Sequence, residues 1–371
     1  MPIQMKAEES SAGLPPPIQE KAAADRPSLL LRWLEGEGFV ATLVVVCFVV
    51  AVPLAPDMST TENLSNLLSN FWPLAIIVVG QTFVLVLAGI DLSQTAVMAV
   101  TNTIGAMLVT SQLSPTQFAK SPFWGHGLGP DGGPFGHLGL AGMVLSMLAV
   151  VLAGALIGLL NGLAVARLGM PPFMVTLGSL LFFGAFAVWM TKSENVTGLP
   201  NGYVQVGQGG LNRFVTGPMV MALAVAALAH FILARTAVGS WFYASGSKRE
   251  VAVISGVPYT RIVIAAYVIS ASCAALGGML YSMRIESGRP TLGGSLLLDV
   301  IGAAVIGGVS LFGGKGSVLG ACLGALLFVV LADALSLMNL SFYVVMIIKG
   351  LVIISAALLD VTRTRILVPG R

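Results

Sequence analysis

An all-α polytopic membrane protein is the fold class that the sequence predicts, on three observations. Hydrophobic residues make up 56% of the chain and charged residues only 9%, whereas soluble domains average roughly 45–50% apolar and 25% charged residues. The apolar residues gather into about ten long runs, and a helix needs about 20 apolar residues to cross a hydrocarbon core of roughly 30 Å. Because lipid offers the backbone no hydrogen-bond partners, such runs are expected to be helices.

The sequence predicts about ten transmembrane helices along the chain. Their approximate ranges are 39–56, 66–88, 93–111, 139–166, 173–191, 217–234, 261–283, 296–311, 317–335 and 342–360. Polar residues or glycines interrupt the second, third and eighth. Residues 1–32, rich in Glu, Lys, Gln, Ala and Pro, lack the features of a signal peptide and predict a disordered tail. We therefore expect one transmembrane domain over residues 33–362 and a short second tail over residues 363–371.

The positive charges predict the orientation of these spans. With the N-terminus in the cytoplasm, thirteen Lys and Arg residues lie inside and five outside, while Lys349 falls within a span. Cytoplasmic loops carry such an excess, so both termini are expected to be cytoplasmic. The inside set is Lys6, Lys21, Arg26, Arg32, Arg167, Arg235, Lys248, Arg249, Arg261, Lys315, Arg363, Arg365 and Arg371, and the outside set is Lys120, Lys192, Arg213, Arg284 and Arg289. No basic stripe indicates a nucleic-acid partner.

A short polar stretch, ASGSKREVAVISGVPY over residues 244–259, stands between two apolar runs on the predicted cytoplasmic side. Ser247 followed by Glu250 matches a capping box, while Gly256 and Pro258 end a helix. The pattern predicts a helix over about 248–255, too short to cross a membrane. It is either an interfacial helix on lipid headgroups or a coupling helix that docks into a soluble partner and transmits its movement to the spans.

Four segments resemble the permease subunits of bacterial ATP-binding cassette sugar importers of the ribose/xylose/galactose type. GSKREVAVISGV (246–257) resembles that family's G-x-N-R-E-A-A-x-x-S-G-I/V, and AGIDLSQTAV (88–97) resembles its G-G-I-D-L-S-V-G-S-V. PPFMVTLGSL (171–180) and LDVIGAAVIGGVSLFGGKGSVLGACLGAL (298–326) resemble two further family segments. The matches run in order from about residue 64 to 360, which identifies residues 33–362 as a permease domain.

The resemblance implies a set of partners and a location in the bacterial inner membrane. It implies a pore of two permease copies, two ATP-binding cassette domains below it, and an external sugar-binding protein above it. It also implies that a coupling helix over about 247–257 contacts the ATPase. The residues of that contact are Ser247, Lys248, Arg249, Glu250, Val251, Ile254 and Gly256. ATP is then bound by the partner, and the chain needs no cofactor of its own.

Polar residues embedded in the spans are candidates for the sugar pathway. A neutral sugar presents hydroxyl groups and apolar faces, so its passage is expected to offer amides, hydroxyls and aromatic rings. The candidates are Phe71, Trp72, Gln81, Phe83, Asn102 and Asn161. The amides have an alternative role, which is to hydrogen-bond neighbouring helices.

Ionisable side chains within spans are costly and therefore informative. Asp91 is placed to cap the helix that follows it, and Asp299 is placed similarly. Lys349 requires an acceptor, for which Asp333 is a candidate. Asp91, Asp299 and Lys349 also leave open an ion-coupled secondary transporter, with these residues as titrating groups. A permease for another small polar solute is a further alternative.

Several chemistries are not indicated. Gly314-Lys315-Gly316-Ser317 lacks the glycine spacing and the Ser or Thr after Lys that a phosphate-binding loop requires. No catalytic pair is evident, the three cysteines have no paired spacing, and the histidines match no metal-ligand pattern. Two glycine ladders, Gly154, Gly158 and Gly162 in one span and Gly316, Gly320 and Gly324 in another, predict close helix packing instead.

Overall fold

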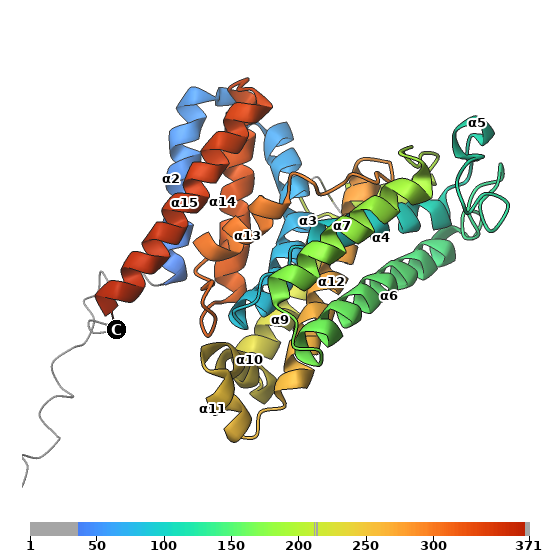
Figure 1. Cartoon of the computed structure of the whole chain (residues 1–371). Helices are drawn as coiled ribbons and strands as arrows, with labels where there is room; N and C mark the ends of the chain where they lie inside the picture. The colour runs from blue at the N-terminus through green and yellow to red at the C-terminus, as the bar shows by residue number, and fades with distance from the viewer. Residues whose placement is uncertain (1–35, 211, 213, 368–371) are drawn as a thin grey trace, which may run out of the picture.

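The computed structural model describes residues 36–210, 212 and 214–367. Helices are the only extended regular elements within these residues, and they form a bundle (Figure 1). The predicted N-terminal tail over residues 1–32, Arg213 and residues 368–371 lie outside the described part. The all-α fold class is therefore confirmed for the described residues.

The helices follow the predicted order. The long helices are α2 (Glu37–Leu54), α3 (Thr61–Val86), α4 (Gln94–Val109), α6 (Gly139–Ala166), α7 (Pro172–Thr191), α9 (Gly217–Arg235), α12 (Tyr259–Arg284), α13 (Leu297–Ile306), α14 (Val318–Leu337) and α15 (Phe342–Leu367). The short elements are η2 (Pro56–Ser59), α5 (Pro115–Phe118), α8 (Asn201–Gln208), α10 (Ala237–Ser247) and α11 (Arg249–Ile254).

Seven helices in the described part of the chain are long and apolar enough to cross a membrane, namely α2, α3, α6, α7, α9, α12 and α14. Each predicted range overlaps one long helix. However, α4, α13 and the apolar part of α15 (Phe342–Leu358) are shorter than the other seven. In α13 the reason is Gly307 and Gly308, which end the helix, with Gly308 at φ +86°. The count of ten transmembrane helices thus stays a prediction for the remaining three.

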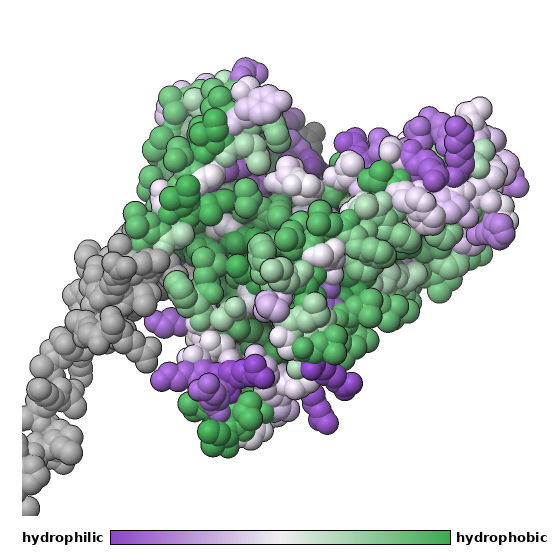
Figure 2. Space-filling view, viewed as in Figure 1, coloured by the Kyte–Doolittle hydropathy of each residue, from purple (hydrophilic) through white to green (hydrophobic). Residues whose placement is uncertain are grey.

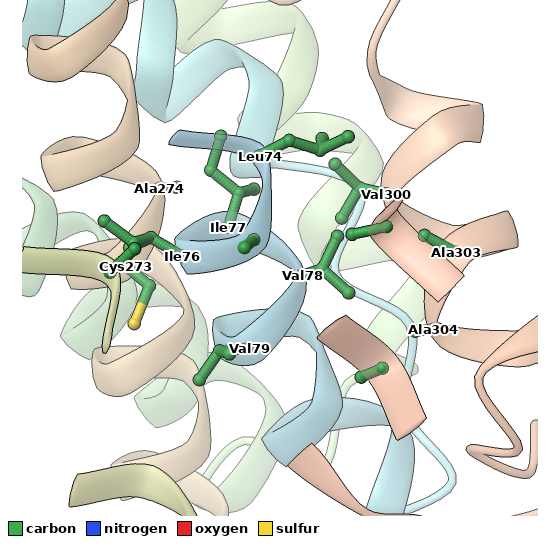
Figure 3. Packing of buried hydrophobic residues seen from close by; sticks show 14 of the residues in the cluster. Leu74, Ile76, Ile77, Val78, Val79, Cys273, Ala274, Val300, Ala303 and Ala304 are labelled. Carbon is green, nitrogen blue, oxygen red and sulfur yellow. The ribbon is translucent and has the colours of Figure 1, made fainter. Parts of the chain in front are cut away.

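Helices α3 and α12 form the centre of the bundle. In their most apolar stretches 83% and 67% of the residues are buried, against 11% in α2 and 17% in α7. Figure 3 shows α3 between two neighbours, with Ile76 near Cys273 of α12 and Val78 directed towards Val300 and Ala303 of α13. The peripheral helices therefore leave their apolar side chains on the outside, as expected where lipid is the surrounding solvent.

The surface of the bundle is likewise divided into apolar and polar regions. Figure 2 shows apolar side chains over the middle of the visible face. Polar residues gather around α10 and α11 at one end and around α5 at the other. An apolar band between two polar ends is the arrangement that a membrane-spanning protein requires.

The first glycine ladder packs α6 against α12, as predicted. A Cβ added to Gly158 would lie 2.3 Å from the carbonyl oxygen of Tyr267, and one added to Gly154 would lie 2.7 Å from that of Ala271. The two backbones therefore approach more closely than any side chain would allow.

The second glycine ladder is confirmed in part. Gly320 and Gly324 of α14 approach the carbonyl oxygens of Gly307 and Ala303 in the same way. Gly316 precedes α14 and contacts Val309 from a loop, so it is not part of that helical face.

Candidate functional site

Residues 237–257 form a pair of short helices, α10 and α11, that projects at one end of the bundle (Figure 1). Helix α10 begins after Thr236, whose hydroxyl oxygen accepts the Gly239 N–H at 3.2 Å. The predicted elements do not include α10, because glycines and serines dilute its apolar pattern. The available signal was Thr236, which is a favoured N-cap residue.

The predicted capping box is wrong. Ser247 is the last residue of α10, and the N-cap of α11 is Lys248, which makes no side-chain capping bond. The physical reason is that α10 continues through Ser247, so its hydroxyl is not placed at the start of a new helix. Helix α11 therefore covers Arg249–Ile254, two residues shorter than the predicted 248–255.

The end of α11 is as predicted. Gly256 adopts the left-handed conformation, with φ +83°. Its N–H donates to the Val253 carbonyl at 3.0 Å, and the Val257 N–H donates to the Ala252 carbonyl at 3.0 Å. This pair of bonds is a Schellman motif, which satisfies the last carbonyls of the helix.

A helix of six residues is unstable alone in water, so tertiary contacts hold α11. Ala252 is buried against the rest of the chain, and the Arg249 guanidinium lies 4.8 Å from the centre of the Tyr259 ring. All seven residues predicted to contact an ATPase, 247–251, 254 and 256, are nevertheless exposed. Ile254 is 86% exposed, so an apolar side chain is accessible at the last residue of α11, at the polar end of the bundle.

Helix α10 connects α11 to the interior. Phe242 is fully buried, and its ring meets that of Phe83 of α3 edge to face at 5.2 Å. The Tyr243 hydroxyl donates to the Gly316 carbonyl at 2.8 Å. A Cβ added to Gly246 would lie 1.7 Å from the Val86 carbonyl oxygen at the end of α3. The α10 helix is therefore fixed against both α3 and the loop before α14.

The α3–α4 junction, residues 87–93, holds a buried polar network. Asp91 accepts hydrogen bonds from the Ser93 N–H at 2.9 Å, the Ser93 hydroxyl at 2.6 Å and the Ser270 hydroxyl at 2.6 Å. Asn161 of α6 donates to the Ser93 hydroxyl at 2.9 Å and accepts from Ser179 of α7. Asp91 thus fixes the N-cap residue of α4, Ser93, rather than capping the N–H groups of the first turn.

The six predicted pathway residues do not form one surface. Five of them have partners inside the protein: Phe71 and Trp72 meet each other at 4.7 Å, Phe83 meets Phe242, Asn161 joins the junction network, and Asn102 bonds the backbone of Arg289. Asn102 donates to the Arg289 carbonyl at 3.0 Å and accepts its N–H at 2.8 Å.

Gln81 differs from the other two predicted pathway amides, although the indole N–H of Trp72 likewise lacks a hydrogen-bond partner among the described residues. Gln81 is fully buried, and neither atom of its amide has a hydrogen-bond partner in the described part of the chain. A groove of about 1080 Å³ between α2, α13, α14 and α15 is lined by none of the six residues.

Lys349 has a different partner from the one suggested by the sequence. Its ammonium group lies 2.6 Å from a carboxylate oxygen of Asp299, and the two side chains are 12% and 7% exposed. Asp333 instead accepts a hydrogen bond from Asn63 at 2.6 Å. The ion pair joins α15 to α13, whereas Asp333 joins α14 to α3.

We expect Lys349→Met to lower the free energy of unfolding by about 3–5 kcal/mol, since it leaves a buried carboxylate uncompensated. The double variant Lys349→Met/Asp299→Leu is expected to recover most of that loss, because neither charge remains. Thermal unfolding of the detergent-solubilised protein measures both. A single variant as stable as the parent chain would show that the pair contributes nothing.

The geometry is that of a helical membrane protein with a tightly packed interior and an exposed helical tip. Residues 63–357 match the family described as branched-chain amino acid transport system / permease component. The chain belongs to this permease family. The family match lies within the predicted transmembrane domain over residues 33–362.

Curated relatives are sugar import permeases. The chain is 32% identical to a ribose import permease protein of Haemophilus influenzae, over 88% of this chain and 93% of the relative. It is 32% identical to a galactose/methyl galactoside import permease protein of the same organism, over 82% of this chain and 88% of the relative. It is 25% identical to a D-allose transport system permease protein of Escherichia coli, over 92% of this chain and 97% of the relative. No solved structure matches the chain.

Proposed function

We propose that the chain is the permease subunit of an ATP-binding cassette importer and forms the pathway for a monosaccharide, ribose-like or a related sugar or polyol. The observation that carries the proposal is α11, an exposed helix with an apolar tip, held on α10, which is itself packed against α3. A passive interfacial helix requires no such attachment to the core. The ribose, allose and galactose named for the relatives support a monosaccharide as the solute.

The partners follow from this role. An ATPase subunit docks on residues 247–257, a sugar-binding protein delivers the solute from outside, and a second copy of the chain completes the pore. Both termini face the cytoplasm, and lipid surrounds the exposed faces of α2, α6, α7 and α9. ATP is bound by the partner, and the chain itself holds no cofactor.

Gln81 is the pathway candidate with the strongest support. A buried amide without partners costs roughly 1–3 kcal/mol, so such a group requires a compensating role. When the helices separate, both its donor and its acceptor are free to bond sugar hydroxyl groups. The other two amides are already bonded within the protein.

An ion-coupled secondary transporter and a permease for another small polar solute are the alternatives. Lys349 and Asp299 neutralise each other, which disfavours them as separate titrating groups.

The test uses proteoliposomes that contain the chain with its co-purified ATPase and binding protein, and labelled ribose, allose or galactose. We expect uptake to require ATP on the ATPase side and to persist when ionophores collapse the proton and sodium gradients. Uptake that follows an ion gradient without ATP would support the secondary transporter instead.

A further inference from the structure

Two chains of side-chain hydrogen bonds at the α3–α4 junction converge on the Asp91 carboxylate. Asn161 donates to the Ser93 hydroxyl, so Ser93 directs its own proton to Asp91. On the other side Gln94 donates to the Ser270 hydroxyl at 2.8 Å, so Ser270 also directs its proton to Asp91. Both serine hydroxyls keep these hydrogen bonds only when Asp91 accepts at both of its oxygens, and hydrogen bonds to a carboxylate are stronger than those between neutral groups.

The network links four helices to a single short segment. Ser93 and Gln94 belong to the start of α4, Asn161 to α6, Ser179 to α7 and Ser270 to α12. A second contact joins the same segment to α7, because the Thr176 hydroxyl lies 3.2 Å from the Ile90 carbonyl oxygen. Residues 90–93 are therefore the point where these helices are tied together.

The residues just before this segment reach the α10 helix directly at Val86 and through the loop before α14. Ala88 lies three residues before Asp91 in a left-handed conformation, φ +59°, and contacts Gly313. Gly313 also lies against the Gly246 carbonyl of α10, and the Gly314 N–H donates to the Val86 carbonyl at 2.9 Å. Gly246 is thus joined to the start of the junction through close contacts with Val86, Gly313 and Ala88.

We propose that Asp91 is a positioning residue, which carries displacements of α10 and α11 to α4, α6, α7 and α12 by holding the α3–α4 junction to them. The proposal rests on the function proposed above, in which an ATPase moves α11. Packed elements of this kind transmit small shifts because they do not deform continuously. Without the network, α11 still docks on the ATPase. Its displacement then reaches residue 88 but is not passed on to α4, α6, α7 and α12.

Asp91→Asn tests the proposal, because it keeps the shape and removes the charge. Its amide nitrogen must donate where the carboxylate accepted, and the Ser270 hydroxyl already accepts from Gln94. The matched control is Asp333→Asn, which changes another intramembrane carboxylate, one bonded to Asn63 and outside the junction network. The readout is solute transported per ATP hydrolysed in proteoliposomes, below the melting temperature of each variant.

We expect Asp91→Asn to keep the ATPase bound and hydrolysing but to lower the solute moved per ATP by about ten-fold, a typical coupling between sites. Asp333→Asn is expected to keep the ratio of the parent chain. A purely structural role would lower transport and hydrolysis together and leave the ratio unchanged, which would overturn the proposal. If Asp91→Asn does not fold, Ser270→Ala replaces it, because it removes one hydrogen-bond donor to Asp91 with little change in volume. The solute moved per ATP hydrolysed by Ser270→Ala then tests the proposal in the same way. A parent chain that moves solute without ATP would instead contradict the proposed function.

Discussion

Gly158→Leu is expected to yield no stably folded protein. The α6 and α12 backbones meet at this glycine, where even a Cβ would lie 2.3 Å from the Tyr267 carbonyl oxygen. A leucine forces the two helices apart along a contact that includes Gly154 and Gly162. Overpacking of this kind costs about 3 kcal/mol or more. The measurement is the yield of monodisperse protein on size-exclusion chromatography, followed by thermal unfolding.

Gly178→Leu is the matched control for this experiment. Gly178 also lies within a membrane helix, α7, but a Cβ added there meets no atom within 4 Å. The control is expected to fold with a melting temperature close to that of the parent chain. If both leucine variants behave alike, the loss is a general effect of glycine replacement, and the packing of α6 on α12 is not its cause.

Glu250→Lys and Gly256→Pro are expected to uncouple ATP hydrolysis from uptake while the chain still inserts and folds. Glu250 is exposed on α11, so its reversal changes the docking surface and leaves the core intact. At Gly256 proline cannot adopt φ +83° and lacks the N–H that bonds Val253. We expect uptake to fall by about ten-fold or more in each variant, as typical coupling energies allow. Uptake and ATP hydrolysis are measured together in proteoliposomes.

Each of these variants has its own control. Asp57→Lys makes an equal change of charge at an exposed position between α2 and α3, away from α11. Gly169→Pro replaces another left-handed glycine, φ +68°, in the loop between α6 and α7. Both controls are expected to retain coupled uptake. Uptake at the parental level by Glu250→Lys and Gly256→Pro would refute the assignment of α11 as the docking helix.

The fold class and the packing glycines could be predicted from the sequence because they depend on local patterns. Long apolar runs require helices in lipid, and glycines spaced by four residues lie on one helical face. For the same reason Gly256 was predicted correctly as a helix end, since its left-handed conformation depends on the residue type.

The polar contacts required the three-dimensional structure. Lys349 lies 16 residues from Asp333 and 50 from Asp299 in sequence, and nothing in the local pattern favours the second. Ser270 and Ser179, which complete the Asp91 network, are ordinary small residues of apolar helices. The capping box failed because a preceding helix, α10, already included Ser247. Local motifs thus identified residues correctly but not their partners.

Photo-crosslinking at position 254 tests the central claim most directly. A photoreactive amino acid replaces Ile254, the most exposed apolar side chain of α11, in the assembled transporter, and a second sample carries it at the exposed Leu140 of α6. We predict a covalent adduct between position 254 and the ATPase subunit, and none from position 140. Adducts of position 254 with lipid alone, in an assembly that still transports sugar on ATP, would contradict the docking of α11 on the ATPase.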